Sequence, residues 1–194
     1  MKNHDFSLSP QSRQSGAALI TGLIFLVVLT MIGITSARMS TLEERMSGNM
    51  RDRSIAMQAA ELALRDAERD ILGAVPASAR SLSGLTGFVA DCGASTAANT
   101  PADTADDGLC YNGAAGYANP IWSTVNMTAA PSVAYGRFTN AANIAGLPVQ
   151  PRYVLEGIRR TPPGGGQIFY YRITARAQGV NGNTVVWLQE VFSP

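Results

Sequence analysis

Histidine and lysine are almost absent from this sequence, and their shortage excludes whole classes of catalytic site. His4 and Lys2 are the only residues of their kinds, and both belong to the polar segment 1–16. Without that segment the chain has no histidine for a Ser-His-Asp or Cys-His nucleophile, or for a His-ligated metal. Phosphate-loop, nucleophile-elbow and HExxH motifs are also missing. We therefore expect no catalytic residues, no cofactor and no metal site.

Cysteine is nearly as scarce, with only Cys92 and Cys110 present. Two cysteines are too few for a zinc site, and these two are too far apart for a CxxC motif. If this part of the chain lies outside the cytoplasm, a disulfide between them is the natural interpretation. Such a bond would constrain the unfolded chain by about 3 kcal/mol in the entropy model. Two free buried thiols are the alternative.

Charge and proline are missing from the stretch 17–37, whose 21 residues also contain no side-chain amide. A helix of that length spans about 31 Å, which matches the roughly 30 Å hydrocarbon core of a bilayer. The sequence therefore predicts a transmembrane half of a helix here. No proline follows before Pro76, and Gly73 is a suitable terminator, so we expect one helix over residues 17–72.

The second half of this helix, residues 38–72, is predicted to be amphipathic. Its apolar residues recur at three- and four-residue spacing and form one stripe, with the charged residues mainly off it. Such a stripe needs a surface to cover it, most simply a sheet in the same chain. The residues expected to pack helix against sheet are Met39, Leu42, Met46, Met57, Ala60, Leu64, Ala67 and Ile71.

The polar segment 1–16 has the character of a leader. Lys2 and Arg13 precede the apolar run, so the positive-inside rule keeps this segment cytoplasmic and places the rest of the chain outside. Three outcomes of processing are open. A secretory peptidase could cut after the apolar run, or the segment could remain as an uncleaved anchor. Alternatively, a leader could be cut after Gly16, which would leave the apolar helix on the mature protein, beginning at Ala17.

The residues on both sides of Gly16 favour the third outcome. Gly16 followed by Ala17-Ala18-Leu19-Ile20 resembles the type IV prepilin cleavage site, where glycine precedes the cut. The runs 44–53 (ERMSGNMRDR) and 58–61 (QAAE) are similar to the N-terminal region of PilX-type minor pilins. This resemblance covers about residues 14 to 68 and is far more specific than a hydrophobic helix alone.

The resemblance implies a location and a set of partners. Prepilin peptidase would remove the leader, and the new N-terminus would be N-methylated. The head would lie in the periplasm while the helix waits in the inner membrane, before the subunit enters an extracellular pilus. The implied partners are other minor pilins, the major pilin and a tip adhesin of the PilC/PilY type. Packing in the filament core would then involve Leu19, Ile20, Thr21, Leu23 and Phe25.

One residue departs from the family pattern. Most pilins have glutamate as the fifth residue after the cut, where it is thought to pair with the terminal amine of a neighbouring subunit. Here that residue is Thr21, which offers only a hydroxyl. An unpaired charge in the apolar core would cost several kcal/mol. The resemblance therefore implies an atypical minor pilin that helps to initiate assembly and sits at the pilus tip, with roles in twitching motility and adhesion.

Residues 73–194 are expected to form a globular head. Residues 73–150 are rich in small residues and lack a sustained period, so we expect loops with short elements around 121–127 and 133–138. Asp103, Asp106 and Asp107 could bind calcium, although a solvated acidic loop explains them more simply.

The C-terminal part of the head, residues 151–194, reads as an antiparallel three-stranded meander. The predicted strands are Arg152–Arg160, Gln167–Gln178 and Asn183–Phe192. The second strand alternates apolar and polar residues, as expected of a sheet that covers a helix with one face. A long helix packed on an antiparallel sheet is an α+β, type IV pilin-like architecture.

Two other functions remain open. A tip pseudopilin of a type II secretion system would lack the same glutamate, although this head is small for the helical insertion those proteins carry. A membrane-anchored periplasmic enzyme or binding module would need a well-formed polar pocket. Four arginines among aromatics, Arg159, Arg160, Arg172 and Arg176, could form a basic patch, but a net charge of +1 gives no general case for nucleic acid.

Overall fold

The computed structural model describes residues 15–73, 80, 82, 84–89, 92, 108–111 and 120–194. The chain divides into two compact units, residues 1–48 and 49–194. The leader up to residue 14 and the possible calcium ligands Asp103, Asp106 and Asp107 lie outside the described residues.

One long helix, α1 (Ser15–Leu72), forms the N-terminal part of the chain. It is uninterrupted because no proline occurs in it, and it ends at the residue that the sequence predicted. Gly73 then takes a φ of 63°, a left-handed conformation that glycine adopts without strain. Its N–H donates a hydrogen bond to the carbonyl of Asp70 at 3.2 Å, which closes the last turn.

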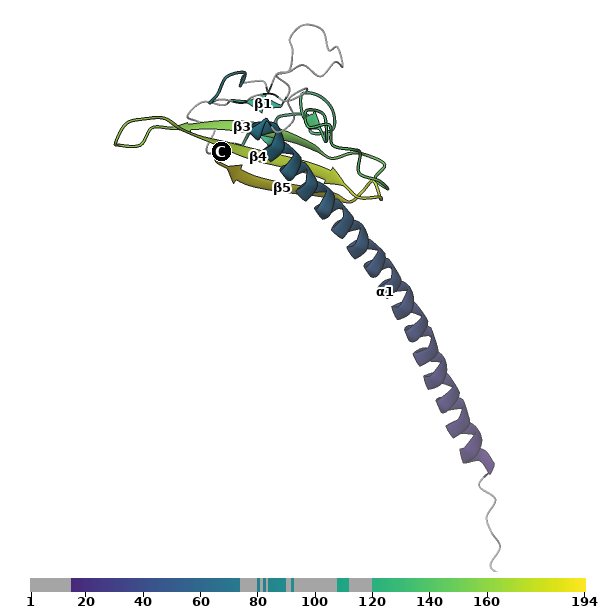
Figure 1. The fold of residues 1–194 in the computed structure, drawn as a ribbon. Helices are drawn as coiled ribbons and strands as arrows, with labels where there is room; N and C mark the ends of the chain where they lie inside the picture. The colour runs from purple at the N-terminus through teal and green to yellow at the C-terminus, as the bar shows by residue number, and fades with distance from the viewer. Residues whose placement is uncertain are drawn as a thin grey trace, which may run out of the picture. The chain divides into compact units, whose positions relative to one another are not determined.

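The sheet of the second unit is built around the predicted meander. It comprises β1 (Leu109–Cys110), β2 (Val133–Ala134), β3 (Arg152–Arg160), β4 (Ile168–Gln178) and β5 (Val185–Phe192). Strands β3, β4 and β5 pair antiparallel in the order in which they occur, and β2 also pairs with β3. Figure 1 shows this order, with the last turns of α1 over one face.

The expected purely antiparallel sheet needs one correction, because β1 pairs parallel with β3. The sheet is therefore mixed. A parallel pair requires a long connection, and the forty or so residues between Cys110 and Arg152 provide it. Within that connection residues 121–123 form a short 3-10 helix, η2 (Ile121–Ser123).

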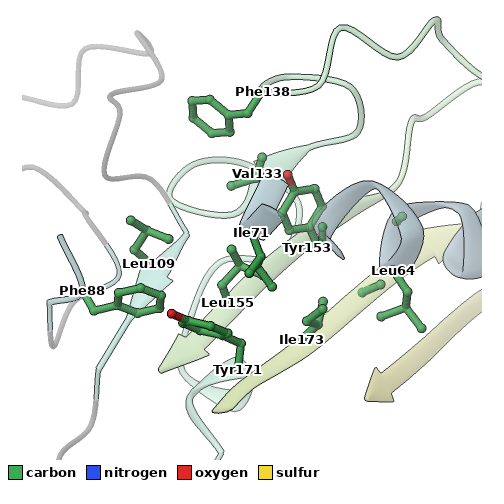
Figure 2. Packing of buried hydrophobic residues seen from close by; sticks show 13 residues of the cluster. Leu64, Ile71, Phe88, Leu109, Val133, Phe138, Tyr153, Leu155, Tyr171 and Ile173 are labelled. Carbon is green, nitrogen blue, oxygen red and sulfur yellow. The ribbon is translucent and has the colours of Figure 1, made fainter. Parts of the chain in front are cut away.

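The main core lies between the end of α1 and the sheet. Leu64 and Ile71 from the helix meet Tyr153 and Leu155 of β3 and Ile173 of β4, as Figure 2 shows. Alternation along β4 explains this packing, because every second residue from Tyr171 to Ala177 faces the helix and is buried. Phe88 closes one end of the core by stacking on Tyr171, with ring centroids 5.6 Å apart.

The face of α1 that packs on the sheet differs from the predicted stripe. Ala60, Leu64, Ala67 and Ile71 are buried as expected. Met57, which belongs to the second unit, is 47% exposed, so its predicted packing on the sheet is wrong. Met39, Leu42 and Met46 are 62–64% exposed and belong to the first unit, so their packing on a sheet stays a prediction. The physical reason is that within the second unit the packing uses small side chains, which allow close approach of helix and sheet. The buried apolar residues that the stripe missed are Ala56, Ala59 and Ala63.

The opposite face of the sheet carries a second, smaller core. Cys92 and Cys110 form the predicted disulfide, and both are fully buried. They pack with Ile121 of η2, Met127 and Val154. The disulfide therefore attaches the segment around residue 92 to the edge of the sheet.

Candidate assembly site and the contacts that hold the head

The first unit presents an apolar helical surface. All described side chains from residue 16 to 50 are exposed in this chain, and Leu19, Ile20, Leu23 and Phe25 are exposed by 60–73%. An 18-residue window of this helix has a mean hydropathy of 2.7 with no burial, so by length and composition the helix could cross a membrane. Soluble monomers rarely expose so large an apolar surface, which indicates that lipid or other helices cover it.

Thr21 is a polar residue near the N-terminal end of this surface. Its hydroxyl donates a hydrogen bond to the carbonyl of Ala17, one turn earlier, at 2.8 Å. The side chain is therefore satisfied within its own helix and carries no charge. Thr30 and Thr35 bond to carbonyls of the preceding turn in the same way. These polar groups can consequently lie in an apolar environment without a partner from another molecule.

In the second unit, Asp52 joins the helix to the turn between β4 and β5. The N–H of Asn181 donates to its Oδ1 at 3.1 Å. The nearby Thr184 hydroxyl and the Asn181 N–H stabilise the charged carboxylate and hold the pKa of Asp52 below its ordinary value. Gly179 lies so close that a Cβ there would be 2.6 Å from both carboxylate oxygens. The carboxylate thus fixes where the hairpin turn contacts the helix.

Asp66 joins the helix to the loop after β2. Its two oxygens accept hydrogen bonds from the Gly136 N–H, at 2.7 Å, and from the Thr139 hydroxyl. Burial raises the pKa of Asp66, and these two hydrogen bonds oppose the shift.

Asp70, one turn further along, makes a buried ion pair with Arg80. Arg80 Nη2 lies 2.5 Å from Asp70 Oδ2, and the hydroxyl of Tyr153 donates to the same oxygen at 3.0 Å. The Arg80 guanidinium also lies 3.8 Å from the centroid of the Phe138 ring. Burial, together with the charges of Asp70 and Asp66, raises the pKa of Tyr153 well above its ordinary value, so the phenol stays a hydrogen-bond donor.

A second buried ion pair lies on the face of the sheet away from the helix. Arg172 donates to both oxygens of Glu156, at 2.9 and 2.6 Å, and the N–H of Ile121 approaches one of them at 3.4 Å. Arg172 is therefore part of the fold of the head. Glu190 belongs to the face toward the helix, so Glu156 and Glu190 lie on opposite faces and form no paired catalytic carboxylates.

The burial of Asp66 and Asp70 was not predicted from the sequence, because charged residues were placed off the packing stripe. Ala59, Ala63, Asp66 and Asp70 succeed one another at spacings of three or four residues. They therefore share the buried side of the helix. That phase was the available signal, since acidic residues in register with a row of alanines share its buried face. Among the described residues, no group of three or more acidic, histidine or cysteine side chains is placed to hold a metal ion.

Two family models match this chain, one at each end. The model of the PilX N-terminal region matches residues 15–65, and the model of the C-terminal part of the type IV pilus assembly protein PilX matches residues 106–194. No curated protein and no solved structure gives a significant match. The two matches together cover well over half of the chain and include both the exposed apolar helix and the sheet. The chain therefore belongs to the PilX family and is a minor pilin of type IV pilus assembly.

Proposed function

We propose that this minor pilin helps to initiate type IV pili and stays at the tip of the filament. The observation that carries the proposal is Thr21, whose hydroxyl is bonded within its own helix. The family resemblance implies that a glutamate at this place receives the terminal amine of a neighbouring subunit. A subunit without that carboxylate cannot pair with the charged terminal amine of a neighbouring subunit. Burying that amine without a partner would cost several kcal/mol. Such a subunit suits the end of a filament, where no further subunit has to be received.

The exposed apolar helix supports the assembly route. We propose that the leader is cut after Gly16 by prepilin peptidase and that Ala17 becomes the N-methylated first residue. Leu19, Ile20, Leu23 and Phe25 then pass from inner-membrane lipid to contacts with other pilins. Lipid and a bundle of apolar helices are both apolar surroundings, and the hydroxyls of Thr21, Thr30 and Thr35 keep their bonds within the helix in either one.

The proposed partners are other minor pilins, the major pilin and a PilC/PilY-type tip adhesin. Loss of this subunit is expected to reduce the number of pili, and with them twitching motility and adhesion. A deletion strain that loses protein secretion but keeps normal pili and twitching would instead favour a type II secretion pseudopilin.

Labelling of the filament tests tip placement. An epitope inserted at Gly165, in the exposed turn between β3 and β4, should leave the fold intact because a side chain there would meet no other atom within 4 Å. Gold-labelled antibody should mark one end of each sheared pilus. The Thr21→Glu variant should add label along the shaft, since it restores the missing carboxylate.

Thr30→Glu is the matched control, because it places the same charge on the same exposed helix at a different depth. It should reduce incorporation without adding label to the shaft. Label distributed along wild-type pili would contradict tip placement. Equal labelling patterns for wild type and Thr21→Glu would contradict the role given to Thr21.

A further inference from the structure

The outer edge of β5 has no described strand beside it. The order of the sheet is β1-β3-β4-β5, so β5 pairs only with β4 among the residues that the structure describes (Figure 1). The Gly179 N–H bonds to the carbonyl of Thr184, which is its direct partner at the hairpin end. Because hydrogen-bonded pairs alternate along antiparallel strands, four residues of β5 direct their backbone N–H and C=O away from β4. These are Val185, Trp187, Gln189 and Val191.

This edge lacks the features that usually prevent pairing with other chains. Strand β5 contains no proline and no lysine, and its register with β4 is continuous, without a bulge. Val191, on the face away from the helix, is 63% exposed. An edge of eight residues with apolar side chains is a template for adding another strand.

A groove runs beside the edge, between α1 and β5, with a volume of about 610 Å³. Leu62, which is 44% exposed, and Leu188 contribute apolar surface. A strand added to β5 would direct every second side chain into this groove and the others toward Val191. Both faces of the added strand would therefore find apolar contacts.

The same groove carries an acidic group that lacks a partner. Oε1 of Glu190 is buried with no hydrogen-bond partner among the described residues. Arg65, whose positive charge acts on Glu190, already donates to both oxygens of Glu68 at 2.8 Å. Glu61 adds a further negative charge to the lining. A positively charged side chain entering the groove would satisfy Glu190 and offset this charge.

We propose that the edge of β5 accepts an extended strand from a different protein, with apolar residues alternating along it and a lysine or arginine that enters the groove toward Glu190. A second copy of this chain fits poorly, because β5 contains no basic residue and would bring another Glu190 to an acidic groove. The inference rests on the sheet edge and the groove, and it does not depend on where the subunit lies in the filament.

Photo-crosslinking in the cell tests this proposal with the full chain. p-Benzoylphenylalanine replaces Val191 at the edge, and in a control it replaces Leu72, which is exposed at the end of α1. The adduct at position 191 should map by mass spectrometry to a segment of another protein with alternating apolar residues and a lysine or arginine within a few positions. The probe at position 72 should not give this adduct.

Two substitutions distinguish strand addition from simple proximity. Gln189→Pro and Gln189→Ala both lose the bond from the Gln189 side-chain amide to the Thr174 hydroxyl of β4, and neither loses a backbone hydrogen bond to β4. Only Gln189→Pro also loses the outward N–H, so the difference between the two variants isolates the edge hydrogen bond. Gln189→Pro should abolish the adduct and Gln189→Ala should retain most of it. Glu190→Gln should reduce the yield about tenfold, as expected for loss of one charge-assisted contact.

Three results would overturn the proposal. The first is an adduct only with a second copy of this chain or with lipid. The second is the absence of any adduct at position 191. The third is an adduct with another protein that is equally strong in Gln189→Pro, provided that the variant has the wild-type unfolding midpoint.

Discussion

Removing the Asp70 carboxylate should be among the most damaging single changes in the head. Asp70 is fully buried. It forms an ion pair with Arg80 at 2.5 Å and accepts a hydrogen bond from the Tyr153 hydroxyl at 3.0 Å. Asp70→Ala takes the carboxylate from both groups while leaving them in the core. Breaking one side of a buried ion pair costs about 3–5 kcal/mol. For a chain of this size we expect the unfolding midpoint to fall by about 10 °C.

Urea unfolding of the full chain in detergent measures the loss of unfolding free energy, and thermal unfolding measures the shift of the midpoint. The two tryptophans, Trp122 and Trp187, lie in the second unit with their ring centroids 5.3 Å apart, so their fluorescence reports on unfolding of the head. Arg65→Gln is the control, since it removes an ion pair on the same helix whose arginine is 70% exposed. It should unfold like wild type, because exposed ion pairs contribute little.

A double substitution tests the reasoning more strictly. Asp70→Leu with Arg80→Met replaces both charges by apolar groups, and such replacements of buried pairs are often neutral. The double variant should therefore be more stable than Asp70→Ala. If Asp70→Ala loses less than about 1 kcal/mol, or if the double variant is the less stable of the two, the pair does not hold the helix end to the sheet as argued.

Three further predictions concern other parts of the chain. Gly157→Ala should destabilise the head by about 1–3 kcal/mol in the same urea assay, because a Cβ there would lie 2.3 Å from Leu85 Cδ2. Burial, followed by the charge of Glu68, raises the pKa of Glu190 above 4.5, so the native head binds this proton more tightly than the unfolded chain. The contribution of Glu190 to stability should therefore fall as pH rises from 4.5 through the native pKa. Glu190→Gln should remove that pH dependence, and at pH 7 it should unfold at a higher urea concentration than wild type. Gly16→Arg should block leader removal, and an unchanged mature mass by mass spectrometry would contradict cleavage at that site.

The elements that the sequence predicted well are those with a strong local period. Strand β3 occupies Arg152–Arg160 as predicted, and β4 and β5 begin within two residues of their expected starts. Alternation of apolar and polar residues determines both the existence and the faces of such strands. The helix end at Leu72 was similarly accessible, because Gly73 and Pro76 follow it.

The parts that could not be predicted depend on contacts between distant residues. Strand β1 is only two residues long, so no period exists to detect, and its parallel pairing follows from its position beside β3. The partners of Asp66 lie about seventy residues away, at Gly136 and Thr139. No local pattern encodes a hydrogen bond over such a separation, although the phase of the aspartates along the helix indicates which face they occupy.

The methionines and the alanines of α1 form two different apolar surfaces with the same helical period. Met39, Leu42 and Met46 are as apolar as a core stripe requires, yet they are exposed. The buried face beyond residue 48 instead combines small residues with Asp52, Asp66 and Asp70, whose hydrogen bonds specify one position of the helix on the sheet. Flexible methionines can adapt to contacts with more than one surface. Fixed polar contacts suit a surface that never separates. Apolarity alone could not distinguish these two surfaces, because both repeat at the helical period.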